Sequence, residues 1–220
     1  MVAPDNLVRL TQVKVIQNSG SSFPNQYTYY ICLNFTIKAR STPWFEGQCS
    51  VNGEPILQYN ESNFTPLGDH GKVIYNTKAC TDFSQRQKDI GEEMRKQILN
   101  TEQGADKTMG RHTLQVTMES QYKQGQLTDS FWKFTMDGQY FFYFNPKNKT
   151  WGVIHDESRG IMEKWKSNRE LQQLLATFSM GDSPHYLKQF LKHWKEMPSA
   201  PCCCSSSVDR SPVFITSCVG

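Results

Sequence analysis

The chain of 220 residues has no long uninterrupted hydrophobic run. Near the N-terminus, Lys14 interrupts the short apolar stretch 13–16, so no signal-peptide core is recognisable there. Near the C-terminus, the apolar stretch 213–216 is much shorter than a spanning helix or the tail of a lipid-anchor signal. The sequence therefore indicates neither a signal peptide nor an anchor, and membrane attachment stays open.

The chain also lacks the short motifs of common enzyme classes. None of the five histidines lies in an H-E-x-x-H arrangement, and no G-x-S-x-G, P-loop or dinucleotide-binding motif occurs. His155 stands beside Asp156 and Glu157, but two acids also suit a helix N-terminus, where they stabilise the helix dipole. A catalytic site would need a distant nucleophile beside these residues, so we expect no enzymatic activity.

Spacing and charge disfavour metal, cofactor and nucleic-acid binding. The seven cysteines form no C-x-x-C pair, so we expect no metal site, and no cofactor motif is present. The formal net charge of +3 is too small to indicate nucleic-acid binding. The aromatic run 140–144 lacks the interleaved basic residues that single-strand binding needs, so we interpret it as a core strand.

Four Asn-x-Ser/Thr sequons are present, at Asn34, Asn60, Asn63 and Asn148. Sequons also arise by chance, but N-glycosylation would require a chain that passes through the secretory pathway. We predict these four asparagines as glycosylation sites, with Asn60 and Asn63 so close that only one of them carries a glycan. The sequons favour an extracellular protein.

Hydrophobic periodicity predicts strands followed by a helix in the first half of the chain. Alternation predicts a strand over 27–38, and Asn52 and Gly53 suit a two-residue hairpin turn because both tolerate positive φ. A further extended segment is predicted over 72–75. The helix is predicted from apolar side chains that recur at helical spacing and share one face: Phe83, Ile90, Met94 and Ile98.

The second half repeats this order. Alternation predicts four strands, over 111–122, 130–136, 139–144 and 150–154. Asp137 and Gly138 suit a second hairpin turn. From Asp156 onward the period is helical, and Gly181 and Pro184 interrupt this long second helix.

Two units of about four strands and one helix predict an α+β fold. In this fold, one eight-stranded antiparallel sheet carries both helices on one face. We expect residues 1–26 to form a flexible leader and residues 198–220 a disordered tail, because both are polar or low in complexity. Residues 27–197 are expected to form the single domain between them.

Several segments resemble the MHC class I-like stress ligands of the natural killer group 2 member D receptor. They are Thr113–Met118, Phe131–Phe134, Asp137–Phe142, Asp156–Ser158, Ile161–Lys166 and Phe178–Asp182. The rodent branch, with the retinoic acid early inducible and minor histocompatibility antigen families, is most similar, and the resemblance covers roughly residues 30–197. It implies an α1α2 platform without an immunoglobulin-like third domain, light chain or bound peptide. It also implies a cell-surface ligand that promotes natural killer and T cell cytotoxicity.

The resemblance further implies that a homodimeric receptor binds across the solvent faces of both helices. The receptor-binding residues expected there are Arg86, Gln87, Lys88, Lys166, Arg169, Glu170 and Gln173. A second hypothesis uses the same platform as a carrier that holds a lipid or another hydrophobic ligand between the helices. An open apolar cavity would favour the carrier, whereas side chains that fill the groove would favour the receptor ligand.

The cysteine assignments also follow from the resemblance. Cys32 and Cys49 would lie on neighbouring antiparallel strands, where a disulfide would stabilise the fold by about 3 kcal/mol. Cys80, near the start of the first helix, would remain unpaired. Human-type relatives tie the second-half sheet to the interrupted helix by a disulfide, and the matching positions here are Ser120 and Ser183.

Overall fold

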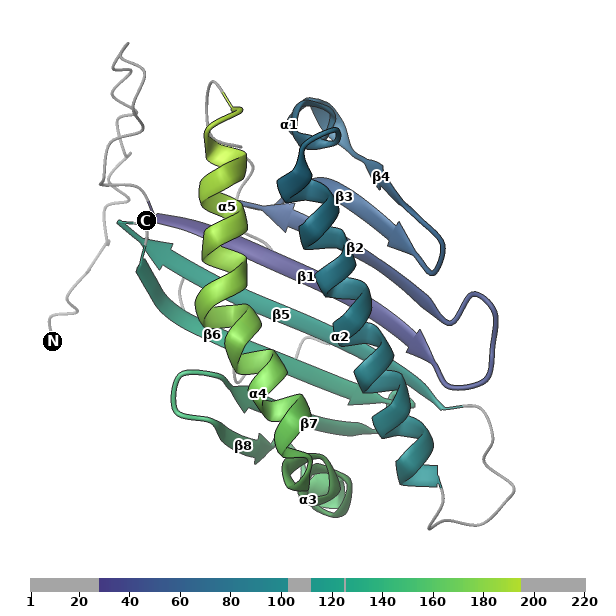
Figure 1. Ribbon diagram of the computed structural model, residues 1–220. Helices are drawn as coiled ribbons and strands as arrows, with labels where there is room; N and C mark the ends of the chain where they lie inside the picture. Colours follow the sequence, from purple (N-terminus) through teal and green to yellow (C-terminus); the bar gives the residue numbers. More distant parts are fainter. Residues whose placement is uncertain (1–27, 103–111, 125, 195–220) are drawn as a thin grey trace, which may run out of the picture.

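The computed structural model describes residues 28–102, 112–124 and 126–194. They form one eight-stranded antiparallel sheet with the helices packed on one of its faces (Figure 1). This architecture confirms the predicted α+β platform. The expected leader and tail, residues 1–26 and 198–220, lie outside the described residues.

The two halves of the chain contribute four strands each. The first half contains β1 (Thr28–Lys38), β2 (Phe45–Val51), β3 (Glu54–Asn60), β4 (Phe64–Pro66), α1 (Gly68–Ile74) and α2 (Lys78–Glu102). The second half contains β5 (Thr113–Lys123), β6 (Gln126–Met136), β7 (Tyr140–Asn145), β8 (Thr150–Val153), the 3₁₀ turn η1 (Asp156–Ser158), α3 (Arg159–Ser167), α4 (Arg169–Thr177), the π turn η2 (Phe178–Asp182) and α5 (Ser183–Leu191). The strand order is β4-β3-β2-β1-β5-β6-β7-β8. Antiparallel pairing of β1 with β5 therefore joins the two halves into one sheet.

Successive residues along the strands alternate between the two faces of the sheet, and the apolar side chains point toward the helices. In β1, Leu33 and Phe35 are buried, whereas Asn34 between them is half-buried on the opposite face. In β7, Phe142 and Phe144 are buried in the same way. The aromatic run is thus a core strand, as predicted.

The extended segment predicted over 72–75 is wrong, because most of it belongs to α1. The fourth strand of the first half is β4 instead. An apolar run this short fits a strand and a helix equally well, so its periodicity could not distinguish them. The backbone of α1 packs directly on β3, where a Cβ atom on Gly71 would overlap the carbonyl group of Ile56.

The predicted disulfide between Cys32 and Cys49 is also wrong. In the pairing of β1 with β2, Cys32 lies opposite Ser50, whereas Cys49 lies opposite Leu33. Successive strand residues point to opposite faces, so the two side chains lie on different sides of the sheet. Cys49 is a free buried thiol, as is Cys80. Cys32 is disulfide-bonded, and its partner lies outside the described residues.

Candidate functional site

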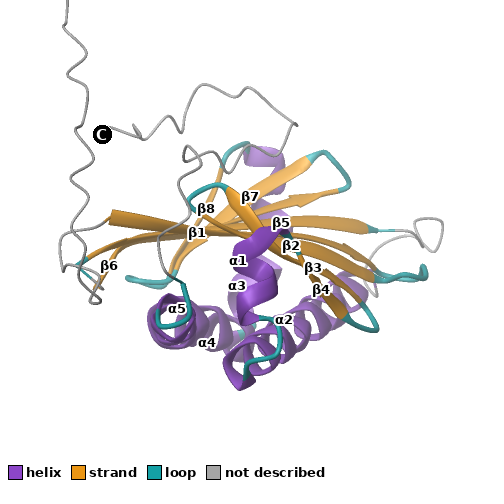
Figure 2. Cartoon of the chain, turned by 90° about the horizontal axis from the view of Figure 1, so that it is seen from above, coloured by secondary structure: helices purple, strands orange, loops and turns teal. Residues whose placement is uncertain are grey.

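The face of the sheet that carries the helices has two long helical segments side by side (Figures 1 and 2). The first segment is α2, and the second consists of α3, α4, η2 and α5 in series. A carrier would need an open groove between these segments. The contacts between them close it instead.

Aromatic side chains fill the space between α2 and α5. The ring of Phe83 on α2 is buried, and its centroid lies 5.5 Å from that of Phe190 and 5.4 Å from that of Tyr186. The ring of Phe178 in η2 stacks on Phe83 at 6.0 Å. Such contacts contribute both apolar burial and favourable ring geometry, so they hold the two helical segments together.

A polar contact joins the segments nearer to α3. Asn168 separates α3 from α4, and its Nδ2 donates a hydrogen bond to Oε1 of Gln97 on α2 at 2.9 Å. The Nε2 atom of Gln97 donates to the carbonyl oxygen of Lys164 at 3.3 Å. Asn168 also caps α4, because its Oδ1 accepts from the backbone N–H of Leu171 at 3.0 Å. One residue therefore interrupts the second segment and ties it to the first.

An ion pair joins α2 to η2. Nε of Arg86 donates to Oδ2 of Asp182 at 2.8 Å, and the two side chains are 38% and 22% exposed. A partly exposed pair of this kind contributes little to stability. The ion pair positions Asp182, the last residue of η2, against α2.

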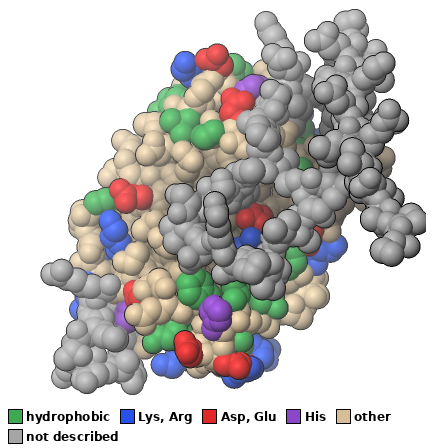
Figure 3. Space-filling model, turned by 180° about the vertical axis from the view of Figure 1, so that it is seen from behind, with side chains coloured by type: hydrophobic (Ala, Val, Ile, Leu, Met, Phe, Trp, Pro, Cys, Tyr) green, Lys and Arg blue, Asp and Glu red, His purple; other side chains and the backbone are tan. Residues whose placement is uncertain are grey.

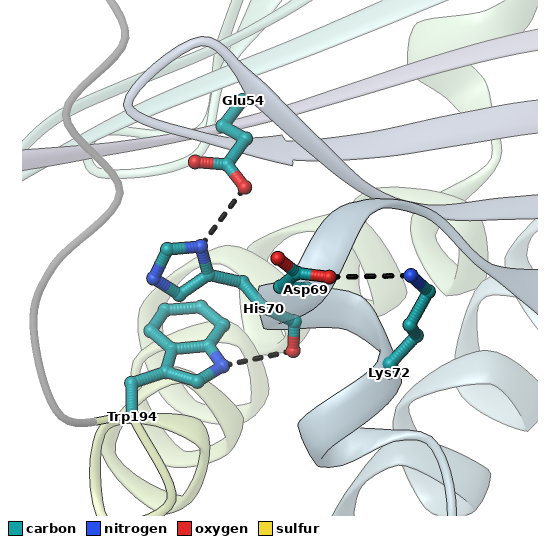
Figure 4. A network of polar contacts seen from close by, with 5 residues as sticks. All are labelled: Glu54, Asp69, His70, Lys72 and Trp194. Atoms are coloured by element: carbon teal, nitrogen blue, oxygen red, sulfur yellow. Dashed lines mark hydrogen bonds and ion pairs between the residues drawn. The ribbon is translucent and has the colours of Figure 1, made fainter.

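A further network ties the residues after α5 to α1 and β3 (Figure 4). The indole Nε1 of Trp194 donates to the carbonyl oxygen of His70 at 3.0 Å, and the two rings meet edge to face at 5.2 Å. Nδ1 of His70 lies 2.9 Å from Oε1 of Glu54. On the outer side of α1, Lys72 pairs with Asp69 at 3.2 Å. The network therefore holds the residue that follows α5 by three positions against α1 and β3.

A buried hydroxyl cluster lies at the two positions where human-type relatives were expected to have a disulfide. Oγ of Ser120 lies 2.8 Å from Oγ of Ser130, and the hydroxyl of Tyr122 lies 3.1 Å from Oγ of Ser183. Burial raises the pKa of Tyr122 to about 12, because a phenolate there would lose its solvation by water. The Tyr122 hydroxyl therefore remains neutral and can donate a hydrogen bond to the helix.

Most of the predicted receptor-binding residues lie on the outer surface of the helices. Four are exposed: Lys166, Arg169, Glu170 and Gln173. Arg86 and Lys88 are half-buried on α2. The structure thus brings these residues to both sides of the closed groove.

Gln87 was wrongly placed on this surface. Its side chain is buried, and Nε2 donates to the hydroxyl of Tyr59 at 3.0 Å. Gln87 lies four residues after Phe83 and three before Ile90, so helical spacing puts it on the apolar face of α2. This spacing in the sequence could have excluded Gln87 from the predicted receptor-binding residues.

Two exposed hydrophobic side chains were missed by the sequence reasoning. Among the described residues, Val73 and Met180 are the large hydrophobic side chains with substantial exposure, at 53% and 51%. Val73 lies on α1, and Met180 lies in η2. Met180 directly precedes Gly181, at which the helix interruption was predicted, and that interruption was the available signal.

The sequon asparagines differ in exposure. Asn60, Asn63 and Asn148 are exposed. Asn34 is half-buried on the central strand β1, where its Oδ1 accepts a hydrogen bond from Oγ1 of Thr117 at 2.9 Å. Glycosylation stays a prediction, and the half-buried side chain of Asn34 makes it the least accessible of the four sites.

The acids after His155 begin the second helical segment. Asp156 and Glu157 belong to η1, and Asp156 pairs with Arg159 at 2.6 Å.

In the described parts of the chain, no group of three or more His, Cys, Asp or Glu side chains could hold a metal ion. None of the helices in those parts is long and apolar enough to cross a membrane.

The chain is similar in sequence to one family model and to several known proteins. Residues 28–197 match the family model described as class I histocompatibility antigen, NKG2D ligand, domains 1 and 2. The chain is 36% identical over 173 residues to retinoic acid early transcript 1E of Homo sapiens, a match that covers 76% of this chain and 65% of that protein. It is 33% identical over 174 residues to histocompatibility antigen 60c of Mus musculus, with 79% and 77% covered. Identity to UL16-binding protein 1 of Homo sapiens is 27% over 181 residues, with 79% and 74% covered.

Proposed function

Because the chain belongs to the class I histocompatibility antigen family of NKG2D ligands, we propose that its helices bind the natural killer group 2 member D (NKG2D) receptor. Acting outside the cell, at its surface or after secretion, the chain would be a stress ligand that promotes natural killer and T cell cytotoxicity. The observation that carries the proposal is the closed groove, in which side chains of the two helical segments pack against each other and leave the outer sides of both segments to a partner.

The closed groove also argues against the carrier hypothesis. A carrier of lipid or of another hydrophobic ligand needs a void between the helices. Phe83, Phe178 and Phe190 meet in that space and bury one another. The same contacts support a platform that functions without a bound peptide.

The proposed receptor footprint lies on both helical segments. On α2 it includes Arg86 and Lys88, and on α3 and α4 it includes the exposed residues Lys166, Arg169, Glu170 and Gln173. A receptor made of two identical subunits can contact both segments at once. Few residues in such a footprint dominate the affinity, and the others exclude water around them.

The opposite face of the sheet supports a platform without a light chain. Its polar side chains pair with one another: Lys133 with Glu119 at 2.9 Å, and Gln121 with the hydroxyl of Tyr30 at 2.9 Å. On the visible part of this face, charged side chains of both signs are interspersed with hydrophobic ones (Figure 3). Paired polar groups of this kind need no partner subunit to satisfy them.

The test is surface plasmon resonance of the full chain against the immobilised receptor ectodomain. We expect saturable binding with a Kd at or below about 1 μM, which corresponds to about −8 kcal/mol. Arg169→Glu should weaken binding by about tenfold, because it reverses a charge inside the footprint. Lys123→Glu is the matched control, since Lys123 is exposed at the end of β5 rather than on the helices. A folded, monodisperse chain that does not bind would overturn the proposal.

A further inference from the structure

Cys32 lies in the middle of the sheet face opposite the helices. It pairs with Ser50 of β2 on one side and with Glu119 of β5 on the other. Cys32 is 2% exposed and Ser50 is 9% exposed, whereas Asn34 on the same face is half-buried. The side chain of Cys32 is therefore almost inaccessible, although the helices pack on the other face (Figure 1).

The sequence limits the disulfide partner of Cys32 to four residues. The chain has seven cysteines, of which Cys32 is disulfide-bonded, whereas Cys49 and Cys80 are free. The residues before position 28 and the segments 103–111 and 125, which the structure does not describe, contain no cysteine. The partner is therefore one of the four cysteines after residue 194, which are Cys202, Cys203, Cys204 and Cys218.

The described chain ends close to the strands that carry Cys32. Nε1 of Trp194 donates to the carbonyl oxygen of His70 at 3.0 Å, and Nδ1 of His70 lies 2.9 Å from Oε1 of Glu54 (Figure 4). Glu54 begins β3 directly after the hairpin turn from β2, at an end of the sheet where a chain can pass from one face to the other. The C-terminal segment thus begins at this end of the sheet.

The distance to Cys32 is short compared with the length of chain available. Pro55 of β3 lies opposite Ser50, and Ser50 lies opposite Cys32, so two strand spacings of about 4.8 Å separate Pro55 from Cys32. Cys202 follows Trp194 by eight residues, which span at most about 29 Å when extended. This length suffices to pass round the hairpin turn and to reach the opposite face of the sheet.

Chain length also favours the cysteine triplet, residues 202–204, over Cys218. Cys218 follows Trp194 by 24 residues, three times the separation of Cys202. The probability that the ends of a flexible segment meet falls with about the 3/2 power of its length, so Cys218 meets Cys32 about fivefold less often. Adjacent cysteines cannot easily pair with one another, and the triplet therefore keeps a thiol available for Cys32.

We propose that residues 195–204 cross from Trp194 to the sheet face opposite the helices, where one cysteine of the triplet forms a disulfide with Cys32. In this step two thiols lose two protons and two electrons. Oxidised glutathione, a small-molecule disulfide, accepts them by thiol–disulfide exchange and leaves as two thiols. The cross-linked segment covers the centre of this face against other subunits and leaves the outer sides of the helices uncovered.

The test is a disulfide map of the full chain, refolded in a mixture of reduced and oxidised glutathione. Free thiols are alkylated in denaturant before the chain is digested with trypsin and its peptides are weighed by mass spectrometry. Trypsin places Cys32 in peptide 15–38, the triplet in peptide 196–210 and Cys218 in peptide 211–220. We expect peptide 15–38 to be linked to peptide 196–210, and a reducing agent should separate the two.

The free thiols of the core provide an internal control in the same digest. Cys49 lies in peptide 41–72 and Cys80 in peptide 79–86, and both should be alkylated. An alkylated Cys32, or its linkage to any peptide other than 196–210, would overturn the proposal. A disulfide between two chains, seen as a dimer on a non-reducing gel, would also overturn it.

Three variants check the assignment from both ends of the cross-link. Cys32→Ser should abolish the linked peptide, whereas the matched control Cys218→Ser should retain it. Circular dichroism melting checks that Cys32→Ser folds. Replacement of the whole triplet by serine changes no residue of the described domain, and it should leave Cys32 alkylated. If Cys32 stays cross-linked in the triplet variant, the proposal is wrong.

Discussion

Gln87 of α2 donates a hydrogen bond from Nε2 to the hydroxyl of Tyr59 in β3, at 3.0 Å, inside the core. Burial raises the pKa of Tyr59 well above its ordinary value, so this hydroxyl stays neutral. The Oε1 atom of Gln87 has no hydrogen-bond partner among the described residues. The pair fixes α2 over β3 and contributes nothing to the outer surface of the helices.

Gln87→Ala should therefore change stability and leave receptor binding unaltered. We expect a loss of about 2 kcal/mol in the free energy of unfolding, because the variant leaves a cavity and removes the partner of a buried hydroxyl. Urea unfolding measures this loss, and surface plasmon resonance at a temperature where the variant is folded should give a Kd within about twofold of wild type. A large loss of affinity in a folded variant would place Gln87 in the interface after all.

Tyr122→Phe should destabilise the chain by about 1–2 kcal/mol at neutral pH. The change removes the hydroxyl that lies 3.1 Å from Oγ of Ser183 and leaves that buried oxygen without this partner. Thermal melting followed by circular dichroism measures the effect. Tyr140→Phe, which alters a half-buried tyrosine at the start of β7, provides the comparison. A melting temperature equal to wild type would show that the hydroxyl does not support the helix.

The stability of the wild-type chain should fall in alkaline solution partly because of Tyr122. Its pKa rises from 10.0 to about 12 on folding, so between these values the unfolded chain releases a proton that the folded chain retains. The contribution of Tyr122 is thus fully present below pH 10 and is lost as the pH rises toward 12. We expect a slope of about −1.4 kcal/mol per pH unit from this group. Urea unfolding of wild type and Tyr122→Phe across this range should give a shallower slope for the variant, and identical slopes would contradict the assignment.

Two glycines with opposite surroundings give a paired prediction. A Cβ atom at Gly71 would overlap the backbone carbonyl of Ile56, whereas one at Gly160 would meet no atom within 4 Å. Gly71→Ala should therefore destabilise the chain by about 3 kcal/mol or more, because two backbones must separate. Gly160→Ala should stabilise it by up to about 1 kcal/mol through helix propensity. Urea unfolding of both variants checks this order. Similar free energies of unfolding for the two variants would show that α1 can move away from β3 at little cost.

Glycan occupancy should follow the exposure of the sequons. A chain secreted from mammalian cells should carry a glycan at Asn148 and at one of Asn60 and Asn63, because these side chains are exposed. Asn34 should be unoccupied, since its Nδ2 lies 3.8 Å from Sγ of Cys32 on a central strand. Intact-mass spectrometry before and after enzymatic deglycosylation counts the glycans, and loss of one glycan in Asn34→Gln would contradict this prediction.

Local sequence signals predicted much of the fold. The hairpin turn at Asn52 and Gly53 has positive φ at both residues, as does the turn at Asp137 and Gly138. The interruption of the second helix lies at η2 and before Pro184, as the helix-breaking residues indicated. These features depend on residues close together in the chain, so a short window of sequence contains their cause.

The candidate site was less predictable because it depends on contacts between distant segments. Exposure of Lys166 and Arg169 followed from helical spacing, but the ion pair of Arg86 with Asp182 joins residues 96 positions apart. Nothing near Arg86 in the sequence indicates that its partner closes a π turn. Met180 was missed for a different reason: the interruption at Gly181 indicated an irregular segment, but it did not by itself specify which side chain becomes exposed.

By itself, the sequence determined the α+β class, the order of most strands and helices (but not β4 and α1), and the face on which most side chains lie, because periods of 2 and 3.6 residues are local properties. Only the tertiary structure decided how these faces meet. The register of β1 against β2 puts Cys32 and Cys49 on opposite sides of the sheet, and one residue of shift would have reversed that result. The packing of Phe83 against Phe190 closes the groove, which local sequence allowed but could not require. Contacts between distant segments depend on how all the side chains of the core pack together, and no short stretch of sequence contains that information.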